Sequence, residues 1–229
     1  MTIAALSPLD LAALLCSRVC HDVIGPVGAI INGLEVLDDE KDEEMRGVAT
    51  DLIRKSANSA SARLQFCRLA FGAAGSMGAS IDSGDAEAVV RGLIGSDRTT
   101  LAWNAHRQFA PKNIVKLLLN LCLVASAAIP RGGVVTVNFT VNGSQADISV
   151  GASGPNARLA HGVGDILSGQ RQADSIDAHS IQPYYTTLLA RECGLALEAK
   201  VTPEGLTLRA KPDGKAGVAS APTAPPSQA

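Results

Sequence analysis

The stretch Cys20-His21-Asp22-Val23-Ile24-Gly25-Pro26 lies within an apolar run that extends from about residue 9 to residue 37. On a helix, where successive residues are about 100° apart, the apolar side chains of this run fall on a single stripe. The stripe consists of Cys16, Cys20, Val23, Val27, Ile30, Leu34 and Leu37. Such an a/d-like pattern predicts one long helix that packs along its length against other helices.

His21 occupies another face of this predicted helix, about 140° from the middle of the stripe, so its imidazole is expected to face solvent. Four residues project to the same side: Arg18, Gly25, Gly28 and Asn32. Each mid-helix glycine costs about 1 kcal/mol relative to alanine, and Pro26 deprives the carbonyl of Asp22 of its hydrogen bond. A bare surface around an exposed imidazole predicts a docking site where another backbone comes close. An ordinary surface histidine is the alternative.

A second helix is predicted over about residues 43–71, after an acidic turn at residues 38–44. Its packing stripe consists of Val48, Leu52, Ala60, Leu64, Cys67 and Phe71. A short loop between two long helices predicts an antiparallel hairpin. One hairpin cannot bury its stripe alone, whereas two hairpins from two chains can form a four-helix bundle. We therefore expect a homodimer built by residues 7–72, with His21 level with residues 58–63 of the second helix.

The remainder of the chain predicts a second, α/β domain. Residues 1–75 hold the hairpin, residues 76–84 are rich in Gly and Ser and predict a linker, and residues 212–229 predict a disordered tail. Between them, helices are expected at residues 85–94, 112–129, 163–167 and 180–193, and strands at residues 100–104, 134–141, 146–150, 195–201 and 206–210. This order predicts helices on one face of a mixed sheet over residues 85–211.

Composition narrows the possible functions. The 229 residues are 46% apolar but only 3% aromatic, which suits helix bundles filled by Ala, Leu and Val, and the net charge of −2 gives no electrostatic case for nucleic acid. No apolar run of roughly 20 residues and no secretory signal is expected. The five cysteines predict buried thiols in a reducing cytoplasm. Zinc at Cys16, Cys20 and His21 is not expected, because the cysteines lie on the stripe and the histidine does not.

The motif His21-Asp22-x-x-x-Pro26 resembles the H-box of the histidine kinase dimerisation and phosphotransfer domain. The longer string from Leu14 to Glu35 resembles the ChpT-type histidine phosphotransferases of alphaproteobacteria. This resemblance implies that His21 is the phosphoacceptor and that Asp22 acts as a base or orients the imidazole. Helical geometry places Arg18, Gly25, Gly28 and Asn32 on the side of His21, and counting back from the turn brings Arg63 level with it. These five residues are the candidate docking surface, with the two arginines as candidates to steady the phosphoryl group.

The second domain resembles the ATP-binding domain of histidine kinases, with Asn120 of Leu117-Leu118-Leu119-Asn120 at the family's magnesium-site asparagine. It departs from that pattern where Ala152 replaces the aspartate that recognises adenine and where no Gly-x-Gly-x-Gly lid follows. Residues 179–185, His-Ser-Ile-Gln-Pro-Tyr-Tyr, stand in place of the second glycine-rich turn. ATP binding needs a carboxylate, a polar cage for Mg²⁺ and glycines. We therefore expect a degenerate nucleotide site, with Asn120 as a structural remnant.

The resemblance implies a histidine phosphotransferase in a bacterial phosphorelay, with no bound cofactor or metal of its own. His21 would accept a phosphoryl group from the receiver domain of a hybrid histidine kinase and pass it to the receiver domains of response regulators, with Mg²⁺ supplied by the partner. Gly25 stands where bifunctional kinases place Thr or Asn, so little phosphatase activity is expected. The second domain would dock receivers, with Tyr184 and Tyr185 as contacts, or support the dimer. The alternatives are an autokinase with a divergent lid and a non-enzymatic binding module.

Overall fold

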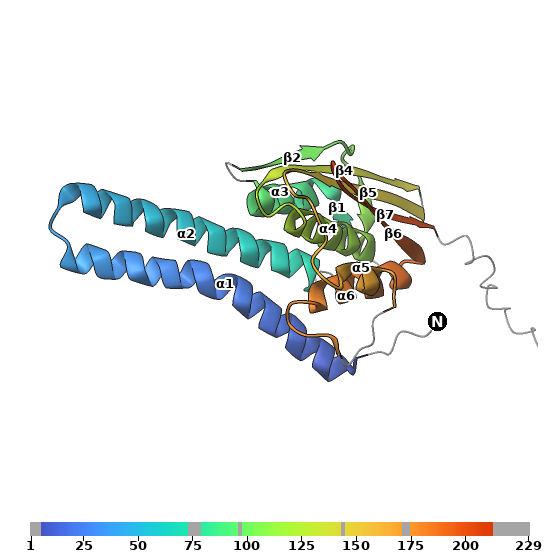
Figure 1. Cartoon of the computed structure of the whole chain (residues 1–229), viewed down its shortest axis with the longest axis horizontal. Helices are drawn as coiled ribbons and strands as arrows, with labels where there is room; N and C mark the ends of the chain where they lie inside the picture. The colour runs from blue at the N-terminus through green and yellow to red at the C-terminus, as the bar shows by residue number, and fades with distance from the viewer. Residues whose placement is uncertain (1–5, 73–78, 96–97, 143–144, 171–174, 213–229) are drawn as a thin grey trace, which may run out of the picture.

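The computed structural model describes residues 6–72, 79–95, 98–142, 145–170 and 175–212. A long helical hairpin extends as an arm from a compact α/β part (Figure 1). The hairpin consists of α1 (Pro8–Asp39) and α2 (Glu43–Ala70). Both helices end within two residues of the predicted bounds, which confirms the hairpin.

Local capping residues fix where the two long helices begin. Ser7 caps α1 through a hydrogen bond from the Asp10 amide to its Oγ at 3.1 Å, and Pro8 occupies the first helical position. Asp42 caps α2 by accepting hydrogen bonds from two amides, at 3.0 Å each. Pro26 lies inside α1, and the helix bends along its length (Figure 1). A bend is expected where proline leaves a carbonyl without its helical hydrogen bond.

The hairpin packs closely at Gly33, the buried residue of α1, where a Cβ atom would lie 2.6 Å from Cγ1 of Ile53. This contact changes the interpretation of the predicted stripe of α1. Three members are half-buried, Val23, Ile30 and Leu37, and four are exposed, Cys16, Cys20, Val27 and Leu34. The stripe therefore straddles two faces, one that packs on α2 and one that this chain leaves uncovered.

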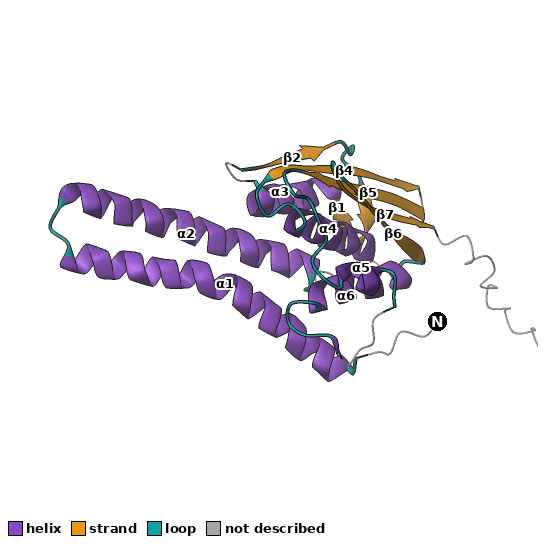
Figure 2. Cartoon of the chain, viewed as in Figure 1, coloured by secondary structure: helices purple, strands orange, loops and turns teal. Residues whose placement is uncertain are grey.

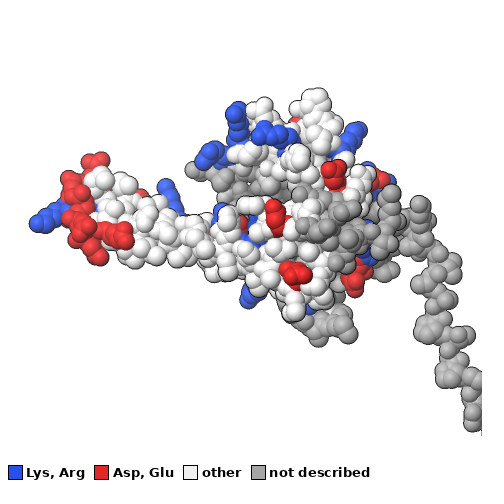
Figure 3. Space-filling view, turned by 60° about the horizontal axis from the view of Figure 1, so that its bottom comes forward, with Lys and Arg blue, Asp and Glu red and all other residues white. Residues whose placement is uncertain are grey.

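By length and composition, α1 is apolar enough to cross a membrane, with a mean hydropathy of 1.5 over an 18-residue window. The expectation that no such run exists is wrong. However, α1 lies along α2, a mostly polar helix, and carries the ion pair between Arg18 and Asp22. The acidic loop between the helices lies at the tip of the arm, where Asp and Glu gather in Figure 3. These features are those of a hairpin helix that packs on protein.

The α/β part confirms the predicted helices on one face of a mixed sheet (Figure 2). Its five-stranded sheet has the order β2-β4-β5-β7-β6, in which β2 and β4 are parallel and the other neighbours antiparallel. The strands are β2 (Thr99–Trp103), β4 (Gly133–Asn142), β5 (Gln145–Ser153), β6 (Leu195–Thr202) and β7 (Gly205–Pro212), and the helices are α3 (Ser83–Ile94), α4 (Lys112–Ala127), α5 (Val163–Leu167) and α6 (Ile181–Glu192).

The predicted linker is too long. A small antiparallel pair, β1 (Ser80–Asp82) with β3 (Phe109–Pro111), and the start of α3 fall within or beside residues 76–84. Asp82 starts α3 by accepting a hydrogen bond from the Gly84 amide at 2.8 Å. Because β1 begins at Ser80, regular structure begins five residues before the predicted start at residue 85. Residues 76–78 of the linker and residues 213–229 of the predicted tail lie outside the described part of the chain.

The hairpin packs against the α/β part at the end of α2 and at the start of α1. At the end of α2, Phe66 and Ala70 are buried in the main core. At the start of α1, Leu11 and Leu14 pack against a small cluster that includes Tyr184, and the Leu6 amide donates a hydrogen bond to the Tyr184 hydroxyl at 3.1 Å. These contacts fix the path of α1 toward His21.

The two tyrosines of α6 are structural. Tyr184 is 3% exposed, and the ring of Tyr185 packs on Phe71 with ring centres 5.7 Å apart. Burial of Tyr184 leaves that side chain no free surface for a partner, whereas Tyr185 is half-buried.

Candidate functional site

His21 lies on the outer face of α1, and its side chain is 72% exposed. Nδ1 is 3.5 Å from Oδ1 of Asp22, whose other oxygen accepts a hydrogen bond from Nε of Arg18 at 3.0 Å. The Asp22 side chain is only 20% exposed, and its carboxylate lies between the His21 ring and the Arg18 guanidinium. A carboxylate beside Nδ1 favours a proton there, which leaves the lone pair on Nε2. His21 therefore presents a nucleophilic nitrogen to solvent.

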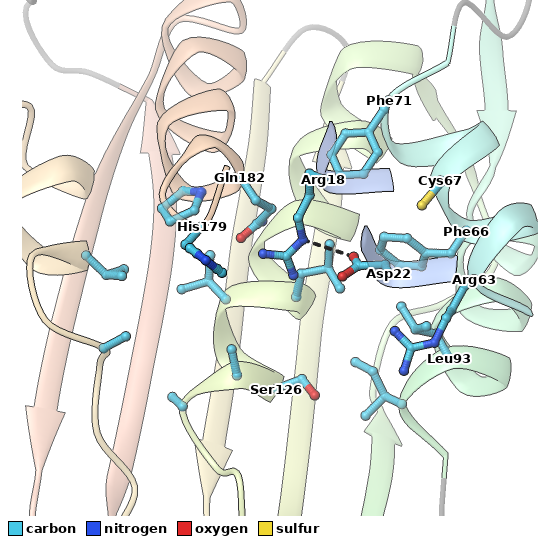
Figure 4. A pocket seen from close by; sticks show the side chains of 18 of the residues that line it. Arg18, Asp22, Arg63, Phe66, Cys67, Phe71, Leu93, Ser126, His179 and Gln182 are labelled. Atoms are coloured by element: carbon cyan, nitrogen blue, oxygen red, sulfur yellow. Dashed lines mark hydrogen bonds and ion pairs between the residues drawn. The ribbon is translucent and has the colours of Figure 1, made fainter. Parts of the chain in front are cut away.

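Arg63 reaches the same place from α2. Arg18, Asp22 and Arg63 together line one side of a cavity of about 280 Å³ between the hairpin and the α/β part (Figure 4). Nε of Arg63 donates to Oγ of Ser59 at 3.4 Å. The apolar wall of the cavity comes from Phe66, Phe71, Leu93, Leu123, Leu159 and Val163. The structure thus brings both predicted arginines to the same cavity as Asp22, the residue that follows His21.

The glycine strip beside His21 is open. Gly25 and Gly28 are one and two turns along α1, and a Cβ atom added at either position would meet nothing within 4 Å. Asn32 is exposed farther along the helix, about 16 Å from His21 by helical rise. The two glycines therefore leave the helix surface open beside His21.

The cysteine beside the site is a protonated thiol. Cys67 lies in the cavity wall, and burial, with the nearby Asp22 charge, raises its pKa to about 11. A thiol with so high a pKa is a poor nucleophile and a poor metal ligand at neutral pH. Among the residues that the structure describes, no group of three or more His, Cys, Asp or Glu side chains is placed to hold a metal ion.

One residue of the site is not identified by the sequence analysis. His179, just before α6, is exposed, and its ring centre is 5.9 Å from that of His21, with the ring planes at 79°. It also lines the cavity, next to Gln182 (Figure 4). The pairing of two residues so far apart in the chain has no sequence signal. The only indication is that His179 opens the segment that replaces a glycine-rich turn.

Asn120 is fully buried in α4, and its amide is used within the protein. Nδ2 donates to the carbonyls of Lys116, at 2.8 Å, and Ala70, at 3.3 Å. Its Oδ1 accepts a hydrogen bond from Nε2 of Gln182 at 3.3 Å. The asparagine therefore ties α4 to the end of α2 and to α6. In this position it does not fit the role of a ligand to a nucleotide-bound magnesium ion.

Ala152 stands at the position where the ATP-binding domains of histidine kinases have the aspartate that recognises adenine. Ala152 lies in β5, paired with Val135 of β4 and Leu206 of β7, and is 3% exposed. A methyl group offers no acceptor to an adenine amino group. At these two positions the side chains are thus an amide that is engaged within the protein and a buried methyl group.

Comparison with known proteins gives consistent matches. Residues 83–205 match the model of the histidine phosphotransferase C-terminal domain. The protein phosphotransferase ChpT of Brucella abortus (strain 2308) is 46% identical over 206 residues, which cover 90% of this chain and 97% of that protein. A solved structure of a bacterial phosphotransferase superposes with a TM-score of 0.84 at 43% identity, over 92% of this chain and 100% of the other.

These relationships extend over the hairpin as well as the α/β part, because the matched region covers nearly the whole chain. They exclude a non-enzymatic binding module as the family's role. The chain belongs to the ChpT-type histidine phosphotransferases and is a phosphotransferase.

Proposed function

We propose that His21 accepts a phosphoryl group from the aspartyl phosphate of a receiver domain and passes it to the aspartate of another receiver domain in a bacterial phosphorelay. The observation that carries this proposal is the exposed His21 ring with Asp22 at Nδ1, beside a strip of bare helix. In this arrangement a nucleophilic nitrogen faces a surface where a second protein can come close.

The chemistry follows from the protonation state of the ring. The lone pair of Nε2 attacks phosphorus in line, the N–P bond forms, and the P–O bond to the receiver's aspartate breaks and restores its carboxylate. Because Nε2 carries no proton, this step needs no proton transfer. Asp22 stabilises the positive charge that develops on the ring. The reverse sequence delivers the phosphoryl group to the next aspartate.

We assign Arg18, Gly25, Gly28, Asn32 and Arg63 to the docking surface. The two arginines lie beside Asp22 and offer positive charge close to the phosphoryl group. The two glycines and Asn32 leave the helix open. Mg²⁺ comes with the receiver domain, and this chain holds no cofactor. Since Gly25 offers no side chain to position a water, phospho-His21 is expected to lose little phosphate to hydrolysis.

The phosphoryl group does not come from ATP in this proposal. The internal hydrogen bonds of Asn120 and the apolar setting of Ala152 support a degenerate nucleotide site. The donor is then a receiver domain of a hybrid histidine kinase, and the acceptors are receiver domains of response regulators. Such a relay operates in the cytoplasm, where we place this chain.

The functional unit in this proposal is a homodimer with a four-helix bundle. Large apolar side chains of both hairpin helices are exposed in the single chain: Ile24, Val27, Ile31, Leu34, Met45, Val48, Leu52 and Leu64. Much of the visible face of the arm carries no charged residue (Figure 3). An exposed apolar surface of this extent favours association with a second copy. Sedimentation at increasing dilution tests the dimer.

The decisive experiment follows labelled phosphate. The purified chain is mixed with a receiver domain that carries labelled aspartyl phosphate and, separately, with labelled ATP and Mg²⁺. Label that reaches the wild type from the receiver but does not reach the His21→Ala variant, with none from ATP, supports the proposal. Label from ATP would identify an autokinase. Rapid release of free phosphate would contradict the low phosphatase activity.

A further inference from the structure

We propose that His179 is a second histidine of the phosphotransfer site, which donates a hydrogen bond to the phosphoryl group on His21. This inference rests on the proposed role of His21 as phosphoacceptor. It gives the α/β part a direct role in the transfer, because His179 belongs to that part and His21 to the hairpin.

The backbone at His179 is held in place. Oδ1 of Asp177 accepts hydrogen bonds from the His179 amide at 3.1 Å, the Ser180 amide at 2.8 Å and the Ser180 hydroxyl at 2.6 Å. The Asp177 amide in turn donates to Oγ of Ser180 at 2.8 Å. These hydrogen bonds, that of the Ser180 side chain first, lower the pKa of Asp177. The carboxylate is therefore ionised at neutral pH, and the turn that carries His179 is well defined.

The two histidines are also held near one another by packing between their elements. The start of α1, with Leu11 and Leu14, packs on Ile181 and Tyr184 of α6. Leu14 precedes His21 by two turns of the same helix. Ile181 follows His179 by two residues. The packing of α1 on α6 thus fixes the backbone near both histidines, and with it the distance between their rings.

The geometry suits a shared phosphoryl group. The ring centres are 5.9 Å apart and the rings are nearly perpendicular, so an edge of one ring faces the other. A phosphoryl group on Nε2 would add three oxygens beyond the ring of His21, toward the surface that both side chains share. A hydrogen bond from an N–H to an anionic oxygen is about 2.7–2.9 Å long. His179 is near enough to donate one without a movement of the backbone.

The two neighbouring arginines do not supply a donor on the His179 side of the phosphoryl group. Arg18 is engaged with Asp22, and Arg63 lies on the α2 side of the cavity. His179 approaches from the opposite side, in the turn just before α6 (Figure 4). An N–H donor on that side would stabilise the phosphoryl charge both on His21 and during transfer, when the charge spreads over the oxygens.

The test measures the phosphohistidine itself. His21 is loaded without a receiver by phosphoramidate, a small-molecule donor that phosphorylates imidazoles, and the ³¹P NMR signal of phospho-His21 is identified by its absence in His21→Ala. The equilibrium of label with a phosphorylated receiver domain is measured in parallel. In His179→Ala we expect the ³¹P signal to shift and the share of label on His21 to fall about three- to tenfold, the effect of one accessible hydrogen bond.

Two further variants separate contact from structure. His179→Asn keeps an N–H donor and is expected to restore part of the equilibrium, whereas His161→Ala, at an exposed histidine elsewhere in the α/β part, changes neither readout. Unchanged ³¹P signal and equilibrium in His179→Ala would overturn the inference. Slower transfer from the receiver with an unchanged ³¹P signal would also overturn it, because His179 would then only bind the receiver. If the wild type itself accepts no label from the receiver, the proposed function is contradicted rather than the role of His179.

Discussion

Leucine substitutions at Gly25 and Gly28 of α1 distinguish the effect of these glycines on stability from their effect on receiver docking. Gly25 and Gly28 lie beside His21, and a side chain added at either would meet nothing within 4 Å in this chain. Gly25→Leu and Gly28→Leu therefore create no clash within the fold. They place a bulky side chain on the surface where we propose that a receiver domain comes close.

The two effects have opposite signs. Replacing a mid-helix glycine by leucine gains about 0.5–1 kcal/mol of helix stability. For a chain of this size, that gain raises the melting temperature by about 1–4 °C per substitution. A leucine that blocks close approach of the partner is expected to lower kcat/KM for transfer at least tenfold, which is about 1.4 kcal/mol.

Thermal unfolding followed by circular dichroism measures the first effect, and the rate of label transfer from a phosphorylated receiver domain measures the second. Gly47→Leu is the matched control, because Gly47 is an equally open helical glycine at the far, loop end of the hairpin. It should gain the same stability and transfer at the wild-type rate. Leucine variants at Gly25 and Gly28 that transfer as fast as the wild type would refute the docking surface.

Three further predictions concern the scaffold. Gly33→Leu should lower the free energy of unfolding by about 1–3 kcal/mol in a denaturant titration, since its Cβ would lie 2.6 Å from Cγ1 of Ile53; an unchanged midpoint would show that the helices separate freely. Asn120→Ala should cost about 2–4 kcal/mol in the same assay, because Gln182 and two carbonyls lose a partner, and a variant as stable as the wild type would contradict a structural role. Burial raises the pKa of Cys122 to about 12, so mass spectrometry after iodoacetamide at pH 8 should find this thiol unmodified until denaturant is added.

The elements that could be predicted from sequence are those whose ends carry local signals. Ser7 and Pro8 mark the start of α1, and the short α5 begins and ends where it was expected. The pair β1 and β3 was missed, because strands of three residues are too short to show a period of two. Its pairing depends on contacts between residues far apart in the chain.

In the candidate site, too, residues placed by local geometry were predicted and a residue placed by tertiary packing was not. His21, Asp22 and the two glycines are neighbours on one helix, so helical geometry alone brings them together. Arg63 was placed by counting across a hairpin turn, which works because the turn is short. His179 could not be placed, since its position depends on how α6 packs against the start of α1.

The three faces of α1 account for its unusual composition. One face packs on α2 and includes the buried Gly33, and a second carries exposed apolar residues such as Ile31. The third, around His21, is bare because glycine replaces the charged residues that usually cover an outer helix face. Two apolar faces and a glycine face leave few positions for charge, which is why α1 is apolar enough to resemble a membrane-crossing helix. In the arrangement proposed here, α1 is this apolar because its three faces contact three partners: α2 of the same chain, a second copy of the chain and a receiver domain.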